Sequence, residues 1–317
     1  MAERAQYLVA DVGGTNTRIA IGGLDGVLHG ETHKNDDVQD LVPLLSETLA
    51  QLGGARPRFA VVAVAGPTEG EEIRLTNRPW KFTRAGLKQI LALDELIVVN
   101  DFFAVAHALP ALEKDELMPI GRATAAKTGN FLACGPGTGF GVSCLVRSGK
   151  EFSAVASEAG HMRLGAANAA EARVIERLVQ DYGAVAVESL LSGRGLAAAH
   201  RVLSGREEST DSIITAAKAG GSEARATVDF FMGIFGRIAG DLALAFDARG
   251  GVYIGGGVGK GLAELYAGSP FEAAFRDHPP YQDRLAAIPI NVILHPFPGL
   301  VGAQQIALAR LRGGLTS

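Results

Sequence analysis

The segment from Asp11 to Arg18, Asp-Val-Gly-Gly-Thr-Asn-Thr-Arg, combines residue types that can hold a phosphate chain. It lies between two apolar runs, 7–10 and 19–21, that have the composition of strands. Glycines leave backbone amides open to phosphate oxygens, and the Asp11 carboxylate can bind the phosphate's metal ion directly or through water. The same segment also suits a hairpin turn. The candidate ligand contacts are Asp11, Gly13, Gly14, Thr15 and Asn16.

A second candidate is the pair Asn100-Asp101, which follows the apolar run 96–99. A carboxylate at the end of a buried strand can accept the proton of a hydroxyl that attacks a phosphate, a role worth about 10²–10⁴ in rate. The alternative is structural, because Asp just before a helix over 102–109 would be a good N-cap. Both roles are compatible within one pair of residues.

Two further glycine turns also follow predicted strands. Gly137-Thr138-Gly139 comes shortly after the run 131–134, and Gly255-Gly256-Gly257 follows 252–254. In α/β proteins, ligands bind at the carboxyl ends of strands, and glycine amides there can approach phosphates closely. Any one of these turns can be purely structural, but three of them together favour a nucleotide site.

Three polar residues in apolar surroundings suggest sugar binding. Glu158 and His161 lie in the segment Ser-Glu-Ala-Gly-His, and Glu188 begins Glu-Ser-Leu-Leu-Ser-Gly. Carboxylates accept hydrogen bonds and histidine can donate or accept them, which suits the vicinal hydroxyls of a sugar. Taken singly, each glutamate could equally be a helix cap or an exposed helix residue.

The bulk composition narrows the class of protein. The chain has 317 residues, of which 47% are hydrophobic and 20% charged, with a formal net charge of −4. This length supports two α/β domains or one large one, and the charge gives no reason to expect nucleic acid or an acidic membrane as a partner. Two cysteines, Cys134 and Cys144, are too few for a disulfide framework. No signal peptide fits the polar N-terminal residues, so we expect a cytoplasmic protein.

The order of elements predicts an internal repeat. Strands are expected at 7–10, 19–21, 27–33, 59–65 and 96–99, with helices at 38–52 and 84–93. Strand, glycine turn, strand, turn and strand recur at 131–155, which predicts two related α/β domains facing each other across a cleft. Helices are further expected at 169–182, 195–203, 210–219, 223–246 and 301–311, strands at 252–254 and 290–294, and a crossover between domains at 111–127.

The ordered set of motifs resembles the bacterial ATP-dependent glucokinases. The resemblance covers nearly the whole chain and rests on the segments 11–18, 99–102, 135–141, 158–161, 188–193 and 254–258. The segment Leu75 to Trp80 also looks like the sugar-side loop of that family, which makes Asn77 a candidate sugar contact.

This resemblance implies an α/β protein with the actin-like ATPase fold, in which two ribonuclease-H-like domains surround a cleft that closes on glucose. A smaller domain would comprise 1–110, completed by a helix over 301–317, and a larger one 111–300. The resemblance also implies ATP and Mg²⁺ as cofactors, glucose as the substrate and a homodimer. We therefore expect ATP-dependent phosphorylation of D-glucose to glucose 6-phosphate.

Individual roles follow from the same resemblance. Asp101 resembles the catalytic base, and the sugar contacts would be Asn77, Asn100, Asp101, Glu158, His161 and Glu188. The two phosphate motifs would be Asp11 to Asn16 and Gly137-Thr138, with Gly256 and Gly257 in the adenosine motif. Asp11 would bind Mg²⁺, directly or through water.

The chain departs from related patterns in a few places. Position 159 is Ala where glucokinases often have Gly. No cysteine follows Cys144, so the zinc motif of the related ROK sugar kinases is not expected and His161 is free to contact sugar. No helix-turn-helix segment precedes Asp11, which argues against a ROK-type repressor. Two alternatives stay open: a kinase of the same fold acting on mannose, fructose or an amino sugar, and a non-catalytic sugar sensor.

Overall fold

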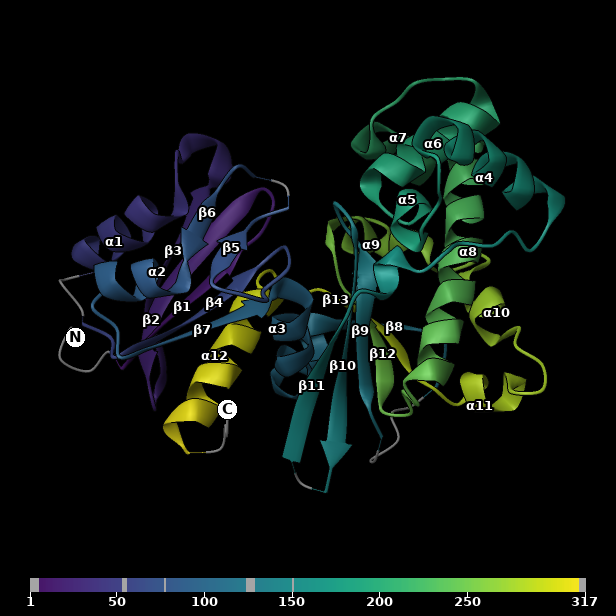
Figure 1. Cartoon of the computed structure of the whole chain (residues 1–317). Helices are drawn as coiled ribbons and strands as arrows, with labels where there is room; N and C mark the ends of the chain where they lie inside the picture. The colour runs from purple at the N-terminus through teal and green to yellow at the C-terminus, as the bar shows by residue number, and fades with distance from the viewer. Residues whose placement is uncertain (1–5, 53–55, 77, 124–128, 150, 314–317) are drawn as a thin grey trace. The chain divides into compact units, whose positions relative to one another are not determined.

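The computed structural model describes residues 6–52, 56–76, 78–123, 129–149 and 151–313. The chain divides into two compact units, which we treat separately (Figure 1). Unit 1 comprises Met1–Leu112 and Pro296–Ser317, and unit 2 comprises Glu113–His295. Each unit is built on a mixed β-sheet of its own.

The sheet of unit 1 has the strand order β3-β2-β1-β4-β7. Its strands are β1 (Tyr7–Val12), β2 (Asn16–Gly23), β3 (Gly26–Lys34), β4 (Phe59–Val64) and β7 (Glu95–Asn100). The first three form an antiparallel meander, and β1, β4 and β7 run parallel. Strands β1 and β4 are buried along their whole length, as expected for central strands with helices on both faces.

Alternate side chains of β1 pack on opposite faces of this sheet. Leu8 and Ala10 pack in a core with residues of α1 (Leu41–Gln51) and α2 (Arg84–Ile90). Tyr7 and Val9 pack instead against α12 (Pro298–Leu311), which also lies against α3 (Asp101–Ala108) (Figure 1). The C-terminal helix is therefore part of the same unit as the N-terminal strand. A small hairpin of β5 (Glu72–Arg74) and β6 (Lys81–Thr83) completes the unit.

Unit 2 repeats this topology with one added strand. Its order is β11-β10-β9-β12-β13-β8, where β9, β12 and β13 are parallel. The strands are β8 (Leu117–Ile120), β9 (Phe131–Pro136), β10 (Phe140–Ser148), β11 (Glu151–Ser157), β12 (Gly251–Ile254) and β13 (Ile290–Ile293). An antiparallel meander followed by parallel strands thus occurs in both units, so the predicted internal repeat is present.

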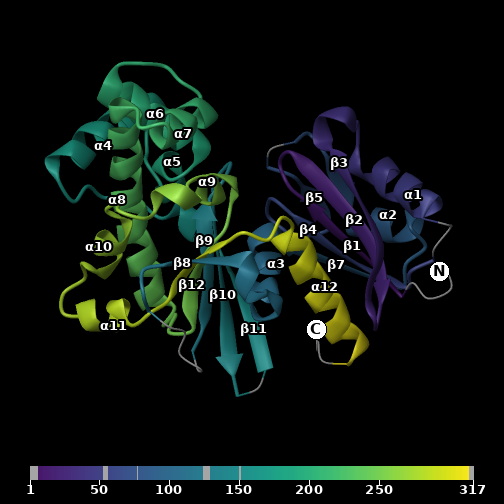
Figure 2. The same cartoon turned by 180° about the vertical axis from the view of Figure 1, so that it is seen from behind.

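The helices of unit 2 gather around α8 (Ser222–Ala245), which lies beside the sheet (Figure 2). Phe235 of α8 meets Phe140 of β10 and Phe271 of α10 edge to face, with ring centroids 5.7 and 5.0 Å apart. The remaining helices are α4 (Ala169–Tyr182), α5 (Val187–Leu190), α6 (Gly193–Ser204), α7 (Thr210–Lys218), α9 (Gly257–Gly261), α10 (Phe271–Arg276) and α11 (Gln282–Ala286). Within the described residues, no helix is long and apolar enough to span a membrane.

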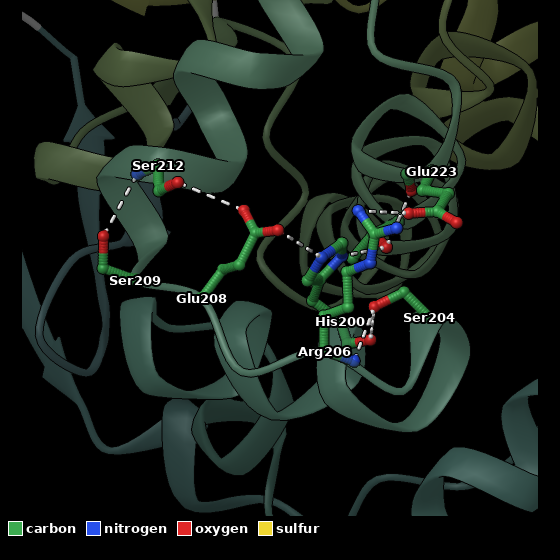
Figure 3. A network of polar contacts seen from close by, with 8 residues as sticks. His200, Ser204, Arg206, Glu208, Ser209, Ser212 and Glu223 are labelled. Carbon is green, nitrogen blue, oxygen red and sulfur yellow. Dashed lines mark hydrogen bonds and ion pairs between the residues drawn. The ribbon is translucent and has the colours of Figure 1, made fainter.

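A polar network, buried at His200 and Thr227, ties α6, α7 and α8 together (Figure 3). The His200 ring of α6 lies 2.8 Å from the Thr227 hydroxyl of α8 and 3.7 Å from Glu208 in the following loop. Glu208 in turn accepts a hydrogen bond of 3.1 Å from Ser212 of α7. The start of α6 is anchored separately, because the Gly193 N–H donates to the Gly137 carbonyl at 2.9 Å. This network holds the helical layer that reaches the second glycine turn.

The segment 111–127, expected as the crossover between domains, contains a strand that was not predicted, and its residues 124–127 lie outside the described residues. Leu117–Ile120 forms β8 and pairs antiparallel with β13, with Ile120 opposite Ile290. Pro119 is compatible with this pairing because β8 is an edge strand, where one missing N–H need not break a ladder. The short strands β5 and β6 and the short helices α5, α9, α10 and α11 were not predicted, since each spans too few residues to show a periodic pattern.

The contact between α12 and α3 predicts a sharp effect of one methyl group. A β-carbon at Gly302 would lie 1.7 Å from the Ala104 carbonyl oxygen. We expect Gly302→Ala to force the helices apart and to lower the free energy of unfolding by about 1–3 kcal/mol. The control is Gly233→Ala in α8, where the nearest atom is 3.8 Å away. It should gain about 0.5–1 kcal/mol from helix propensity. Equal melting temperatures for the two variants would contradict this packing.

Candidate active site

The carboxyl ends of three parallel strands form one edge of the sheet in unit 1. Val12 of β1, Val64 of β4 and Asn100 of β7 are in register across this edge. β1 and β7 are two strand spacings apart, or about 10 Å. The turn after β1 and the residue after β7 are therefore within reach of one ligand. Open α/β sheets bind ligands outside such strand ends.

One buried side chain, Asn35, shapes the turn after β1. Its Nδ2 donates to the Gly13 carbonyl at 2.7 Å, and its backbone N–H donates to the Thr15 carbonyl at 2.9 Å. The Thr17 hydroxyl donates to Asn35 Oδ1 at 2.8 Å, and Asn35 is fully buried. Because a trans peptide directs its C=O and N–H in opposite directions, the bond to Gly13 turns the Gly14 N–H away from Asn35.

Sequence reasoning missed two residues that hold this turn. Asn35 lies 22 positions after Gly13 and outside every motif, so no spacing signal pointed to it. Arg78 stands inside the segment interpreted as a sugar-side loop, yet its Nε donates to the Gly14 carbonyl at 3.0 Å. Its neighbour Asn77 lies outside the described residues.

Asp11 is the buried carboxylate of unit 1. Its side chain is 11% exposed, and Oδ2 accepts a hydrogen bond from Arg18 Nη1 at 3.2 Å. Burial raises the pKa of Asp11, and the neighbouring Arg18 acts in the opposite direction. A β-carbon at Gly299, in the first turn of α12, would lie only 2.7–2.8 Å from the carboxyl atoms. Glycine at 299 therefore leaves room for this carboxylate.

The donor set around Asp11 fits a cation held mainly by phosphate oxygens and water. Mg²⁺ is commonly bound in this way, through one or two carboxylates together with substrate phosphates. In the part of the chain that the structure describes, no three His, Cys, Asp or Glu side chains form a metal cage. A carboxylate with one oxygen engaged by Arg18 suits an ion that arrives with a nucleotide.

The pair after β7 divides its roles differently from the expectation. Asn100 is the N-cap of α3, and its Oδ1 accepts from the N–H groups of Phe102 at 2.9 Å and Phe103 at 3.3 Å. Asp101 is the first helical residue, so the interpretation of Asp101 as the cap is wrong. Because the cap uses only Oδ1, the Asn100 Nδ2 group can still donate to a ligand.

In unit 2 the glycine turns meet through backbone contacts. A β-carbon at Gly135 would lie 2.1 Å from the Gly255 carbonyl oxygen, and one at Gly256 would lie 2.3 Å from that of Pro136. These approaches leave no room for side chains at either glycine. The turn Gly137–Gly139 is therefore held directly against the loop after β12, which brings Gly137 and Thr138 together with Gly256 and Gly257.

Glu188 of α5 also lies against this turn. Its Oε2 accepts a bond of 3.4 Å from the Phe140 N–H, and its Oε1 accepts one of 3.0 Å from Arg194. A β-carbon at Gly139 would lie 2.6 Å from Oε2. The Glu188 carboxylate is therefore fixed beside the second glycine turn.

Glu158 is the N-cap of a single 3₁₀ turn (Ala159–His161), and His161 is the last residue of that turn. Their Oε2 and Nε2 atoms are 3.8 Å apart, and both side chains are largely exposed. A β-carbon at Gly160 would lie 2.2 Å from the Phe140 carbonyl oxygen, so this turn packs on the backbone of Phe140. The same residue donates its N–H to Glu188. The three polar residues that suggested sugar binding therefore gather around Phe140.

The candidate residues thus form one cluster in each unit. Unit 1 contributes Asp11, Gly13, Gly14, Thr15, Asn16, Asn100 and Asp101. Unit 2 contributes Gly137, Thr138, Glu158, His161, Glu188, Gly256 and Gly257.

The chain is similar to known glucokinases over nearly its whole length. The family profile described as Glucokinase matches residues 8–310. The glucokinase of Paramagnetospirillum magneticum is 39% identical over 305 residues, which cover 93% of this chain and 95% of that protein.

Solved structures show the same likeness. A glucokinase from an Antarctic psychrotroph superposes with a TM-score of 0.82 at 30% identity, covering 95% of this chain and 98% of that one. A glucokinase from Balamuthia mandrillaris, solved in complex with glucose, gives a TM-score of 0.79 at 22% identity, covering 96% and 93%. The second match bears on the fold alone. The predicted α/β class and actin-like ATPase fold are confirmed.

The turn after β1 depends on Asn35. Asn35→Ala should leave the Gly13 carbonyl and the Thr17 hydroxyl without their partner, which costs about 1–3 kcal/mol in the free energy of unfolding. Ser46→Ala is the control, because Ser46 only bonds back to Val42 within α1. It should change stability by less than about 0.5 kcal/mol. Denaturant titration measures both, and a matching loss in the two variants would contradict the special role of Asn35.

Proposed function

The chain belongs to the glucokinase family, and on this premise we propose that it transfers the γ-phosphoryl group of ATP to the 6-hydroxyl of D-glucose with Asp101 as the base. One observation supports this base above all. Asp101 follows the last residue of β7, at the sheet edge where β1 leads into the glycine turn. Phosphoryl transfer needs this combination of a proton acceptor and phosphate donors.

The proposed reaction is a direct displacement at phosphorus. A bond forms between the glucose 6-oxygen and the γ-phosphorus, and the bond from that phosphorus to the β,γ-bridging oxygen breaks. The proton of the 6-hydroxyl passes to the Asp101 carboxylate. Asn100, whose Oδ1 is committed to the helix cap, would donate a hydrogen bond to the sugar from Nδ2. The cap would thereby orient both residues of the pair.

The remaining sugar hydroxyls would be bound by Glu158, His161 and Glu188, with Asn77 as a further contact. The exposure of Glu158 and His161 leaves their polar atoms accessible. Glu188 is already fixed through the Phe140 N–H, so it would accept a hydrogen bond from a sugar hydroxyl without losing its orientation. This arrangement supports recognition of vicinal hydroxyls.

ATP would bind to both glycine turns. The segment from Gly13 to Asn16 and the pair Gly137-Thr138 would contact its phosphates, and Gly256 and Gly257 would contact the adenosine. The N–H groups of Gly13 and Gly137 already donate to the Asn16 and Gly139 carbonyls, so the donors to phosphate would come from the other residues of these turns. The support in unit 2 is the close backbone packing at Gly135 and Gly256, which holds the turn at Gly137-Thr138 against the loop after β12. Asp11 would hold Mg²⁺, directly or through water, and the ion would offset the negative charge of the phosphates. From the family resemblance we extend the proposal to a homodimer in the cytoplasm.

The base assignment predicts separate effects on chemistry and binding. We expect Asp101→Ala and Asp101→Asn to lower kcat by about 10³ or more while glucose binding stays measurable, because neither side chain can take the hydroxyl proton. Asp94→Ala is the control, since Asp94 is an exposed partner of Arg58 in the same unit. A coupled assay gives kcat, and calorimetry gives glucose affinity. Near-normal turnover in either Asp101 variant would sink the assignment.

A hexose panel tests the substrate. In the same assay, glucose should give a higher kcat/KM than mannose, fructose or glucosamine. A different preferred sugar would replace glucose in the proposal. Sugar binding with no detectable ATP turnover would point to a sensor.

The raised pKa of Asp11 predicts a pH effect at limiting Mg²⁺. A raised pKa means that the carboxylate becomes protonated at a higher pH than usual, and protonation removes the charge that a cation needs. On acidification, the KM for ATP should therefore rise from a higher pH than for an ordinary aspartate. Asp11→Asn should show weak ATP binding throughout and lack this acid limb. An identical pH profile in both proteins would contradict a metal role for Asp11.

A further inference from the structure

Arg78 joins three segments of unit 1 through one guanidinium group. Its Nε donates to the Gly14 carbonyl at 3.0 Å, and its Nη2 donates to Asp36 Oδ1 at 2.6 Å. The guanidinium carbon lies 6.0 Å from the centre of the Trp80 ring. The Arg78 side chain is 22% exposed, against 81% for Asp36. Arg78 is therefore held in place, and it is not a freely moving surface cation.

The Gly14 carbonyl is the part of the turn that Asn35 does not hold. Asn35 bonds the carbonyls of Gly13 and Thr15, whereas Arg78 bonds the one between them. The Gly14 carbonyl shares a peptide plane with the Thr15 N–H, and the two point in opposite directions. Fixing this carbonyl toward Arg78 therefore fixes the Thr15 N–H on the opposite side.

We propose that Arg78 is a positioning residue for ATP: by holding the Gly14 carbonyl, it orients the Thr15 N–H toward the phosphates. This inference rests on the proposed function, because it takes the turn after β1 to be a phosphate site. It gives Arg78 a role in nucleotide binding, although Arg78 belongs to the segment Leu75 to Trp80, which resembles a sugar-side loop. Glycine at 14 makes such a clamp necessary, since a peptide next to glycine rotates easily.

The geometry requires arginine at this position. A guanidinium is a planar fork that can bond the Gly14 carbonyl and Asp36 at once while lying near an aromatic ring. Lysine presents one point charge at the end of a flexible chain, so it can satisfy one acceptor well but cannot reproduce the fork. We therefore expect Arg78→Lys to retain part of the function that Arg78→Ala loses.

The test compares Arg78→Ala and Arg78→Lys with Arg58→Ala. Arg58 also pairs with an aspartate in unit 1, Asp94, at 2.7 Å, but it precedes the opposite end of β4 and is 83% exposed. Each protein is assayed for kcat and for the KM of ATP and of glucose. Binding of the non-hydrolysable analogue AMPPNP with Mg²⁺, and of glucose alone, is measured by calorimetry, and melting temperatures are recorded.

We expect Arg78→Ala to lower kcat/KM for ATP about 10–100-fold and to weaken AMPPNP binding, because a preoriented donor is lost. Its affinity for glucose alone should change less than about twofold, and Arg78→Lys should be intermediate. Arg58→Ala should match the wild type. If the alanine variant does not fold, the lysine variant must show the loss of AMPPNP affinity at an unchanged melting temperature.

Two results would overturn the proposal. One is a lowered melting temperature with ATP parameters equal to wild type, which would make Arg78 purely structural. The other is an equal loss of glucose and ATP affinity, which would place its effect on the sugar side. Failure of the proposed function would look different. The wild-type protein would then bind AMPPNP, and this binding would depend on Arg78, but the protein would phosphorylate no glucose.

Discussion

A turn that is proposed to bind phosphate needs its peptide planes held in one orientation, so that its N–H groups can face the ligand. In unit 1 this constraint is met by Asn35 and Arg78, which bond the carbonyl groups of Gly13, Gly14 and Thr15 from outside the turn. Asn35 is buried, so its own polar atoms must also be satisfied, and Thr17 supplies that partner. The conformation of a short glycine segment is thus determined by the structure packed around it. The rest of the unit provides the rigid frame for this arrangement, since Thr17 belongs to β2 and Asn35 follows β3 directly.

Unit 2 meets the same requirement by a different physical means. Its strands repeat the topology of unit 1, but its turn is held mainly by backbone contacts between two glycine loops. Side-chain clamps tolerate substitutions around them better than backbone contacts do, because a backbone contact fails as soon as a β-carbon is added. Gly135 and Gly256 each illustrate this, with a carbonyl oxygen at 2.1 and 2.3 Å from the position of a β-carbon. The repeated fold therefore preserves the location of the turn while the contacts that support it differ.

The local part of this design could be predicted from the sequence, and the long-range part could not. The strand and turn at 7–16 show a continuous apolar run, a carboxylate at its end and two glycines within ten residues. The order of motifs was also sufficient to indicate the family and the fold. By contrast, the bond between Asn35 and Gly13 depends on how β3 returns beside β1 and β2, which no local pattern encodes.

The Asn100 cap was missed for a local reason, because helix α3 begins one residue earlier than the apolar pattern indicates. Strand β8 was missed because its pairing with β13 joins segments about 170 residues apart.

Asp11 shows how such a site lowers the stability of the folded chain. Burial raises the pKa of this carboxylate, so its ionised form is less favourable in the folded chain than in the unfolded one. The destabilisation is complete above the raised pKa and disappears as the pH falls toward the ordinary value for aspartate. Arg18 reduces this effect but does not reverse it, and its guanidinium is itself held near the Phe297 ring at 4.7 Å. A side chain at position 299 would displace the Asp11 carboxylate, but the glycine there, in the first turn of α12, leaves room for it.

A fold selected for stability alone would place a neutral or apolar residue at position 11. A buried, partly neutralised carboxylate instead suits the proposed role of Asp11, because a cation that arrives with the nucleotide would relieve the same unfavourable charge.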